Sequence, residues 1–167
     1  MKKEGLLMTI TIRPIKQQDN PAIEQIIKHI LEEHHLDVPG TAYFDPQLGH
    51  LYEHYKVMPN GEYWVILEGD IVIGGVGIGP FGEYKEIAEL QKYYLKKEYQ
   101  GLGYGRRLFT QAINFVKKHN YSKLYLETSD LLGEANQIYR HWGFKSLEKP
   151  LDGSDHPLMN RWFIKDI

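Results

Sequence analysis

The sequence contains no cysteine, and this absence removes several kinds of chemistry at once. Without a thiol there is no disulfide, no zinc–thiolate site and no cysteine nucleophile. Long apolar runs are missing too, so we expect no membrane-spanning helix. The apolar run at residues 6–8 is too short for a signal peptide, and we expect a cytoplasmic protein.

An excess of charge of one sign is also missing. Twenty lysines and arginines stand against 22 aspartates and glutamates, which gives a formal net charge of −2. This balance predicts neither nucleic acid nor an anionic membrane as a partner. A chain of 167 residues with 42% hydrophobic residues is long enough for one domain with a core. We expect a flexible leader over residues 1–8 and a single domain over residues 9–167.

Strand and helix patterns alternate along the chain. Alternating apolar residues predict a first strand at 9–13, and apolar stripes of helical period predict helices near 21–36, 45–55, 103–119 and 131–142. Asp19 or Asn20 is a predicted helix cap, and so is Asp45. Further strands are predicted at 63–67, 71–78, 86–95, 124–128, 144–147 and 159–165. Glycines inside the 71–78 strand indicate a close approach by another group.

The connections between these elements predict how the strands pair. Short turns favour antiparallel pairing among the early strands. A whole helix separates the strands at 86–95 and 124–128, so this pair should be parallel. The order of elements predicts an α/β fold, with a mixed sheet of six to seven strands and helices on both faces.

A glycine-rich turn lies between the strand at 86–95 and the following helix. Main-chain N–H groups at a helix start have no intrahelical partner, and the helix dipole adds positive charge there. We interpret the turn as a phosphate cradle; the simpler alternative is a turn that only reverses the chain. The P-loop pattern is absent, and G-x-G-x-x-G fails after Gly105. The segment consists of Gln100, Gly101, Leu102, Gly103, Tyr104 and Gly105, followed by Arg106 and Arg107.

Two motifs together resemble the GNAT-type N-acetyltransferase superfamily. The first is Gln-x-x-Gly-x-Gly at residues 100–105, opening a helix after a strand. The second is Ala-x-x-x-Tyr-x-x-x-Gly-Phe at residues 135–144. The resemblance covers about residues 9–166. It implies the GNAT fold, acetyl-CoA as co-substrate, and transfer of the acetyl group to a primary amine by direct attack in a ternary complex.

The resemblance also implies roles for individual residues. The backbone of Tyr93, Tyr94 and Leu95 would pair with the pantetheine arm, and residues 100–107 would hold the pyrophosphate. Tyr139 matches the tyrosine that donates a proton to the departing thiolate; the alternative is a core tyrosine. Glu89 stands where family members often place a catalytic carboxylate; the alternatives are a surface glutamate and a water chain as base.

One position departs from the family pattern. The family often has an asparagine seven residues before the tyrosine, and this position is Leu132 here. Asn136, three residues before Tyr139, is the asparagine that this segment offers as a cofactor contact. The family role does not transfer to it directly.

Several alternatives stay open at this point. A non-catalytic acyl-CoA sensor or a nucleotide-binding protein could use the same cradle. His50 and His54 have a spacing that could seat a metal, but no third ligand accompanies them, so we expect no metal. The acceptor is a small-molecule or peptide amine, and a homodimer is common in the family. Residues that could border the acceptor site are His34, His35, Tyr43, Phe44 and His156.

Overall fold

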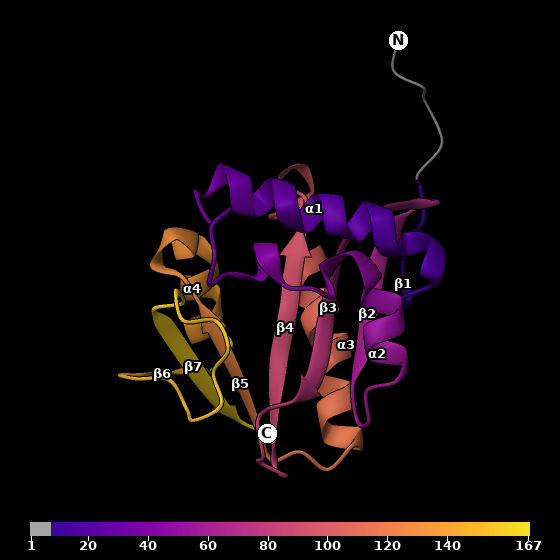
Figure 1. Cartoon of the computed structure of the whole chain (residues 1–167). Coiled ribbons are helices and arrows are strands. Elements are labelled where there is room, and N and C mark those ends of the chain that lie inside the picture. Colours follow the sequence, from indigo (N-terminus) through magenta and orange to yellow (C-terminus); the bar gives the residue numbers. More distant parts are fainter. Residues whose placement is uncertain (1–7) are drawn as a thin grey trace.

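The computed structural model describes residues 8–167, and its elements follow the predicted order (Figure 1). The predicted leader therefore lies outside the described residues, except for Met8. The strands are β1 (Ile10–Pro14), β2 (Glu62–Glu68), β3 (Ile71–Pro80), β4 (Ile87–Leu95), β5 (Lys123–Thr128), β6 (Lys145–Leu147) and β7 (Arg161–Asp166). The longer helices are α1 (Asn20–Glu33), α2 (Leu51–Lys56), α3 (Tyr104–Lys118) and α4 (Gly133–His141).

The strands form one seven-stranded sheet in the order β1-β2-β3-β4-β5-β7-β6. β4 and β5 pair in parallel, and the other neighbours pair antiparallel. The predicted mixed sheet and its parallel pair are confirmed. None of the helices described between residues 8 and 167 is long and apolar enough to cross a bilayer.

Helices cover both faces of the sheet, so its central strands are apolar on both sides. Along β2, Trp64 and Ile66 pack toward α3, whereas Tyr63, Val65 and Leu67 pack toward α1 and α2. This follows from the two-residue period of a strand. Figure 1 shows α1 and α2 on one side of the sheet and α3 on the other.

β4 and β5 separate soon after they meet. Their pairing runs only from Ile87 to Glu89 on β4, and in the described part of the chain no strand continues it toward Leu95. A bulge next bends β4, because one residue of β3, Val76, opposes two residues of β4, Lys92 and Tyr93. Lys92 has a φ of +46°. The phenol of Tyr63 donates to the Lys92 carbonyl at 2.8 Å and holds the bulge. One edge of β4 is therefore left open.

Three local predictions were wrong. Asp19 is the N-cap residue of α1 as predicted, but its carboxylate accepts from Arg13 and from the Lys16 N–H and makes no cap hydrogen bond to α1. Asp45 caps no helix and pairs with more distant residues. Ion pairs outweighed the capping preference in both cases. The helix expected at 45–55 begins later, because a short 3-10 turn occupies Leu48–His50. The apolar stripe of the helix predicted at 131–142 was expected to face the core, but two of its members, Leu131 and Ile138, are exposed.

Candidate active site

A cleft of about 680 Å³ occupies the space between the separating strands. β4 forms its floor, and the loop after α1, the start of α4 and the loop before β7 form its walls. The structure brings six of the predicted site residues together along it, namely Glu89, Tyr93, Tyr94, Leu95, Gln100 and Tyr139.

The glycine turn continues from the Gln100 end of this cleft into α3. Gly101 and Gly103 have φ values of +78° and +87°, which side chains disfavour. A Cβ at either position would meet nothing within 4 Å, so backbone conformation and not crowding requires glycine there. Gly103 is the N-cap residue, and no side chain among the described residues caps α3. The first N–H groups of the helix, from Tyr104 to Arg106, are therefore free to bind an anion.

Tyr93 ties the open strand to this turn. Its phenol donates a hydrogen bond to the main-chain carbonyl of Gly105. A Cβ at Gly105 would lie 2.9 Å from the same phenol oxygen, so this glycine makes room for the contact. Burial raises the pKa of Tyr93, which keeps the phenol a donor. The two predicted cofactor segments are thus joined directly.

Among the other predicted residues of the turn, Gln100 makes a side-chain hydrogen bond, and the rest are half-buried or exposed. The Gln100 side chain donates to the Leu95 carbonyl at 2.9 Å and so secures the end of β4. Leu102 is exposed, and Tyr104 is half-buried. Arg106 and Arg107 are exposed and border a shallow groove beside β1, separate from the main cleft.

Tyr139 reaches the cleft from α4. Its ring packs between Phe144 and Phe163, with ring centroids at 5.7 and 5.8 Å. Burial raises the pKa of Tyr139, so its phenol stays protonated, and no residue from 8 to 167 is hydrogen-bonded to it. Asn136 behaves differently: it is absent from the cleft wall, and its amide donates to the Ser129 carbonyl at 3.2 Å.

Glu89 lies on the floor of the cleft at the last position of β4 that pairs with β5. Its Oε1 accepts a hydrogen bond from the side-chain amide of Gln91 at 2.7 Å. Burial raises the pKa of Glu89 to about 7, and the charges of Glu127 and Asp155 add to the shift. A carboxylate with such a pKa can take up a proton near neutral pH.

Comparison with known proteins decides the family. The model of the acetyltransferase (GNAT) family matches residues 23–144. The chain belongs to the GNAT family of acetyltransferases. The uncharacterized N-acetyltransferase YjgM of Escherichia coli K12 is 35% identical over 147 residues, which are 87% of each chain. The predicted enzyme class, an acetyl-CoA-dependent N-acetyltransferase, is confirmed.

Solved structures agree on the fold. A GNAT acetyltransferase from Staphylococcus aureus Mu50 superimposes with a TM-score of 0.83 at 22% identity, covering 95% of this chain and 99% of its own. The yncA acetyltransferase from Salmonella typhimurium, solved with its cofactor acetyl-CoA, gives a TM-score of 0.73 at 18% identity, with coverage of 95% and 93%. The predicted GNAT-like fold is confirmed.

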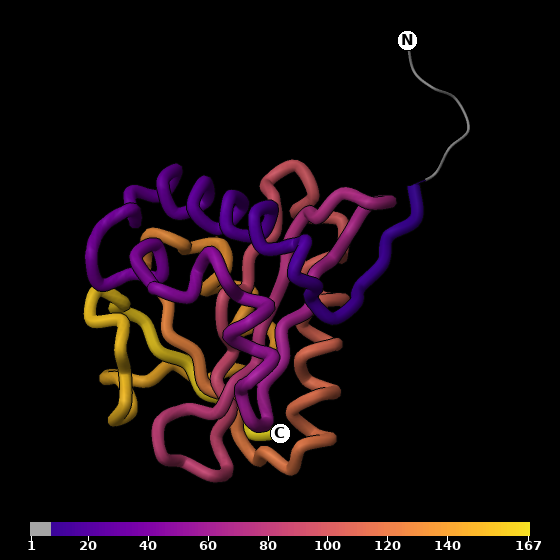
Figure 2. The backbone as a smooth tube through the Cα atoms, turned by 45° about the vertical axis from the view of Figure 1, so that its right-hand side comes forward, coloured from indigo at the N-terminus to yellow at the C-terminus, as the bar shows by residue number. Residues whose placement is uncertain are grey.

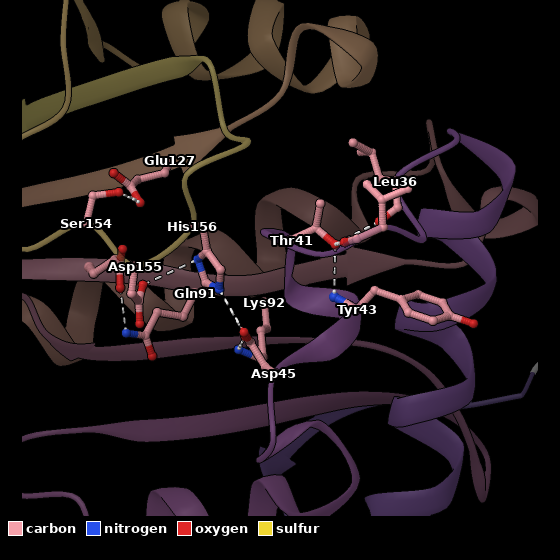
Figure 3. A network of polar contacts seen from close by, with 12 residues as sticks. Leu36, Thr41, Tyr43, Asp45, Gln91, Lys92, Glu127, Ser154, Asp155 and His156 are labelled. Atoms are coloured by element: carbon pink, nitrogen blue, oxygen red, sulfur yellow. Dashed lines mark hydrogen bonds and ion pairs between the residues drawn. The ribbon is translucent and has the colours of Figure 1, made fainter.

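This GNAT enzyme also has a charged cluster that the sequence did not predict (Figure 3). Asp45 accepts from Lys92 at 2.7 Å and from His156 at 3.0 Å. Burial alone would raise the pKa of Asp45, but the His156 hydrogen bond and the Lys92 charge outweigh it and lower the pKa. Conversely, the hydrogen bond to Asp45 raises the pKa of His156. Asp45 was missed because an aspartate before a proline also looks like a helix cap.

The same cluster joins two loops of the GNAT enzyme over the cleft. His156 lies in the loop before β7 and Asp45 in the loop after α1. The main-chain N–H of Leu158 also donates to the Gly40 carbonyl at 3.3 Å. Figure 2 shows these loops side by side.

The residues predicted to border the acceptor are only partly in place. His34 and His156 line the cleft, and so does His54. His35, Tyr43 and Phe44 are absent from the cleft wall. The Tyr43 phenol donates to Glu32 instead, and Phe44 is exposed.

Three side chains could together face a cation in the GNAT cleft. Ligand atoms of Glu127, Asp155 and His156 lie within 4.8 Å of one another. Two of these residues are already engaged. Glu127 accepts from the hydroxyls of Tyr125 and Ser154, and Nε2 of His156 faces Asp45. Because hydrogen bonds already use these atoms, we assign no metal to the group.

Proposed function

We propose that this enzyme transfers the acetyl group of acetyl-CoA to a primary amine by direct attack in a ternary complex. One observation carries the proposal: Glu89, with a pKa of about 7, and Tyr139, with a protonated phenol, line the same cleft. A carboxylate base and a phenolic acid are the two groups that amine acetylation needs.

Glu89 acts as the base. A primary amine is protonated at neutral pH and cannot attack until it loses a proton. The Glu89 carboxylate accepts this proton and later releases it to solvent. The neutral nitrogen then forms a bond to the acetyl carbonyl carbon, and the positively charged nitrogen of the tetrahedral intermediate loses its second proton to solvent as the amide forms. Glu127 and Asp155, at the same end of the cleft, favour an acceptor that arrives as a cation.

Tyr139 acts as the acid. As the C–S bond of the thioester breaks, the sulfur takes the bonding electrons, and the Tyr139 phenol gives it a proton. Solvent then returns a proton to the phenolate. The raised pKa of Tyr139 keeps the phenol protonated at neutral pH but makes it a weaker acid, so the negative charge that develops on the sulfur must draw the proton across.

The open edge of β4 and the start of α3 position the donor. Backbone groups of Tyr93, Tyr94 and Leu95 would pair with the pantetheine arm as an added strand would. The free N–H groups at the start of α3 would hold the pyrophosphate. Because both reactants lie in one cleft, orientation supplies much of the rate.

Thiol release from acetyl-CoA, measured against a panel of amines, tests the activity. The panel contains free amino acids, diamines, aminoglycosides and lysine peptides. Release that depends on one amine class supports the proposal and names the acceptor. CoA binding without release for any amine favours the alternative, a non-catalytic sensor.

Tyr139→Phe tests the acid role. It should lower kcat by about a hundredfold while the affinity for CoA stays within a factor of two. Tyr84→Phe is the matched control, because Tyr84 stacks on Phe81 and is not part of the cleft wall. Unchanged turnover in Tyr139→Phe rejects the assignment.

A further inference from the structure

A chain of hydrogen bonds runs from Glu89, through Gln91 on the cleft wall, into the core beneath α2. Gln91 donates to Glu89 Oε1 at 2.7 Å, and the Tyr55 phenol donates to Gln91 Oε1 at 2.5 Å. Tyr55 belongs to α2 and is 3% exposed. Three side chains from two elements therefore form one chain of hydrogen bonds that ends on the proposed base.

The chemistry of its two ends permits a single orientation of Gln91. Burial raises the pKa of Tyr55 well above its ordinary value, so the phenol donates and needs an acceptor. An ionised Glu89 only accepts, so it needs a donor. The Gln91 amide satisfies both when its oxygen faces Tyr55 and its nitrogen faces Glu89. Tyr55 thus determines which atom Gln91 presents to the carboxylate.

The glycines of β3 make room for this chain. A Cβ at Gly77 would lie 2.5 Å from the Tyr55 phenol oxygen, and one at Gly79 would lie 3.1 Å from each polar atom of the Gln91 amide. Neither glycine has a positive φ, so backbone conformation does not demand them. The glycines in the predicted strand at 71–78 indicated a close approach, and in the structure Tyr55 approaches Gly77.

We infer that Tyr55 and Gln91 are positioning residues that hold Glu89 with one oxygen bound and stabilise its ionised form. This inference rests on the proposed role of Glu89 as the base. Oε1 is occupied by Gln91, and no hydrogen bond among residues 8–167 reaches Oε2. Oε2 is therefore the atom left for the acceptor amine. Neither positioning residue touches the reacting atoms in this account.

The chain of hydrogen bonds from Tyr55 through Gln91 to Glu89, here called the relay, is not the only influence on the pKa of Glu89. Burial is the largest influence and raises its pKa, and the charges of Glu127 and Asp155 raise it further. The Gln91 hydrogen bond and the charge of His156 lower it. The phenols of Tyr55 and Tyr125 also face it, and both have raised pKa values and stay neutral. Loss of the Gln91 hydrogen bond should therefore raise the pKa of Glu89.

The pH profile of kcat/KM in Gln91→Leu and Tyr55→Phe tests the relay. The acidic limb should move to higher pH by about one unit in Gln91→Leu, since a hydrogen bond to a charged group is lost. It should move in the same direction, by less, in Tyr55→Phe. Tyr121→Phe is the matched control: it removes a buried phenol that donates to the Asn60 carbonyl at 2.9 Å. The limb should stay in place in this control.

Gly79→Ala provides an independent variant that keeps both relay residues. Its new methyl group would press on the Gln91 amide and on the Met58 sulfur, both at ends of flexible side chains. The fold can therefore accommodate the change while the amide moves off Glu89. We expect the acidic limb to rise as it does in Tyr55→Phe.

A direct titration separates the relay from the base role. Carboxyl ¹³C NMR of the acceptor-free protein gives the pKa of Glu89 in each variant. If the carboxyl pKa rises and the acidic limb of the kcat/KM profile moves to higher pH with it, both the relay and the role of Glu89 as the base are supported. A raised carboxyl pKa with an unmoved kinetic limb keeps the relay and rejects Glu89 as the base. A carboxyl pKa that does not change in Gln91→Leu overturns the relay, whatever the kinetics do.

Discussion

The phenol of Tyr93 donates a hydrogen bond to the main-chain carbonyl of Gly105 and thereby joins β4 to the first turn of α3. β4 carries the open edge proposed for the pantetheine arm, and α3 starts with the free N–H groups proposed for the pyrophosphate. One side chain therefore sets the distance between the two parts of the donor site.

Tyr93→Phe should weaken CoA binding about fivefold, because loss of one hydrogen bond of about 1 kcal/mol frees the first turn of α3. Isothermal titration with CoA measures the effect. Tyr121→Phe loses a comparable buried phenol and should lose stability without losing CoA affinity. Equal CoA affinities in the parent and Tyr93→Phe would contradict the proposed tether.

Gly103→Ala should lower the free energy of unfolding by about 1–2 kcal/mol, because the residue keeps a φ of +87° at the start of α3. Urea unfolding measures the change. Gly133→Ala is the control for stability: its φ is −56° and a Cβ there meets nothing within 4 Å. That variant should be as stable as the parent or slightly more stable.

Glu89→Gln should make the protein more stable at pH 8, even though it removes the proposed base. The pKa of Glu89 is about 7 in the folded state against an ordinary value of 4.5, so the folded state holds this proton more tightly. Stability is therefore lost as pH rises from about 4.5 to 7. The gain at pH 8 is on the order of 3 kcal/mol at most, and it should become small near pH 5 and vanish below about pH 4.

Urea unfolding of the parent and Glu89→Gln at pH 5 and pH 8 measures this difference. The control is Glu83→Gln, since Glu83 is exposed in the loop before β4. A gain of the same size at both pH values would mean that ionisation of Glu89 is not its cause.

Asp45→Asn should lower the pKa of His156, because the hydrogen bond to this carboxylate is the largest influence that raises it. A histidine whose pKa is raised on folding adds stability below its unfolded value, and this stability disappears as pH rises through the folded pKa. The variant also leaves the buried ammonium of Lys92 unpaired, at a cost of about 3 kcal/mol.

NMR titration of the His156 ring and urea unfolding at pH 6 test both effects of Asp45→Asn. Asp130→Asn is the matched control, because Asp130 is an exposed partner of Arg161 at 3.7 Å. It should cost less than about 1 kcal/mol and leave His156 unchanged. An unshifted His156 in Asp45→Asn would show that Asp45 does not control its charge.

Much of the fold could be predicted from local sequence patterns. The period of the apolar residues predicts each longer strand and helix, and the helix between residues 103 and 119 predicts that β4 and β5 are parallel. The predictions that failed were caps and boundaries. The carboxylates of Asp19 and Asp45 found charged partners that no local pattern identifies.

The candidate site divides in the same way. The glycine turn was predictable because its chemistry is local: positive φ at Gly103 and the first free N–H groups of α3 both follow from neighbouring residues. The relay to Glu89 was not predictable, because Tyr55 and Gln91 are 36 residues apart.

The sequence by itself predicted the GNAT family, which the family model confirms, and the segment that we propose meets the donor, since both depend on short motifs and on the conformation of a few consecutive residues. The tertiary structure alone decided the proton affinity of Glu89 and the partners of Asp45. These depend on burial and on charges brought together across the fold, and Asp45 and His156 are 111 residues apart. No local spacing encodes such a distance.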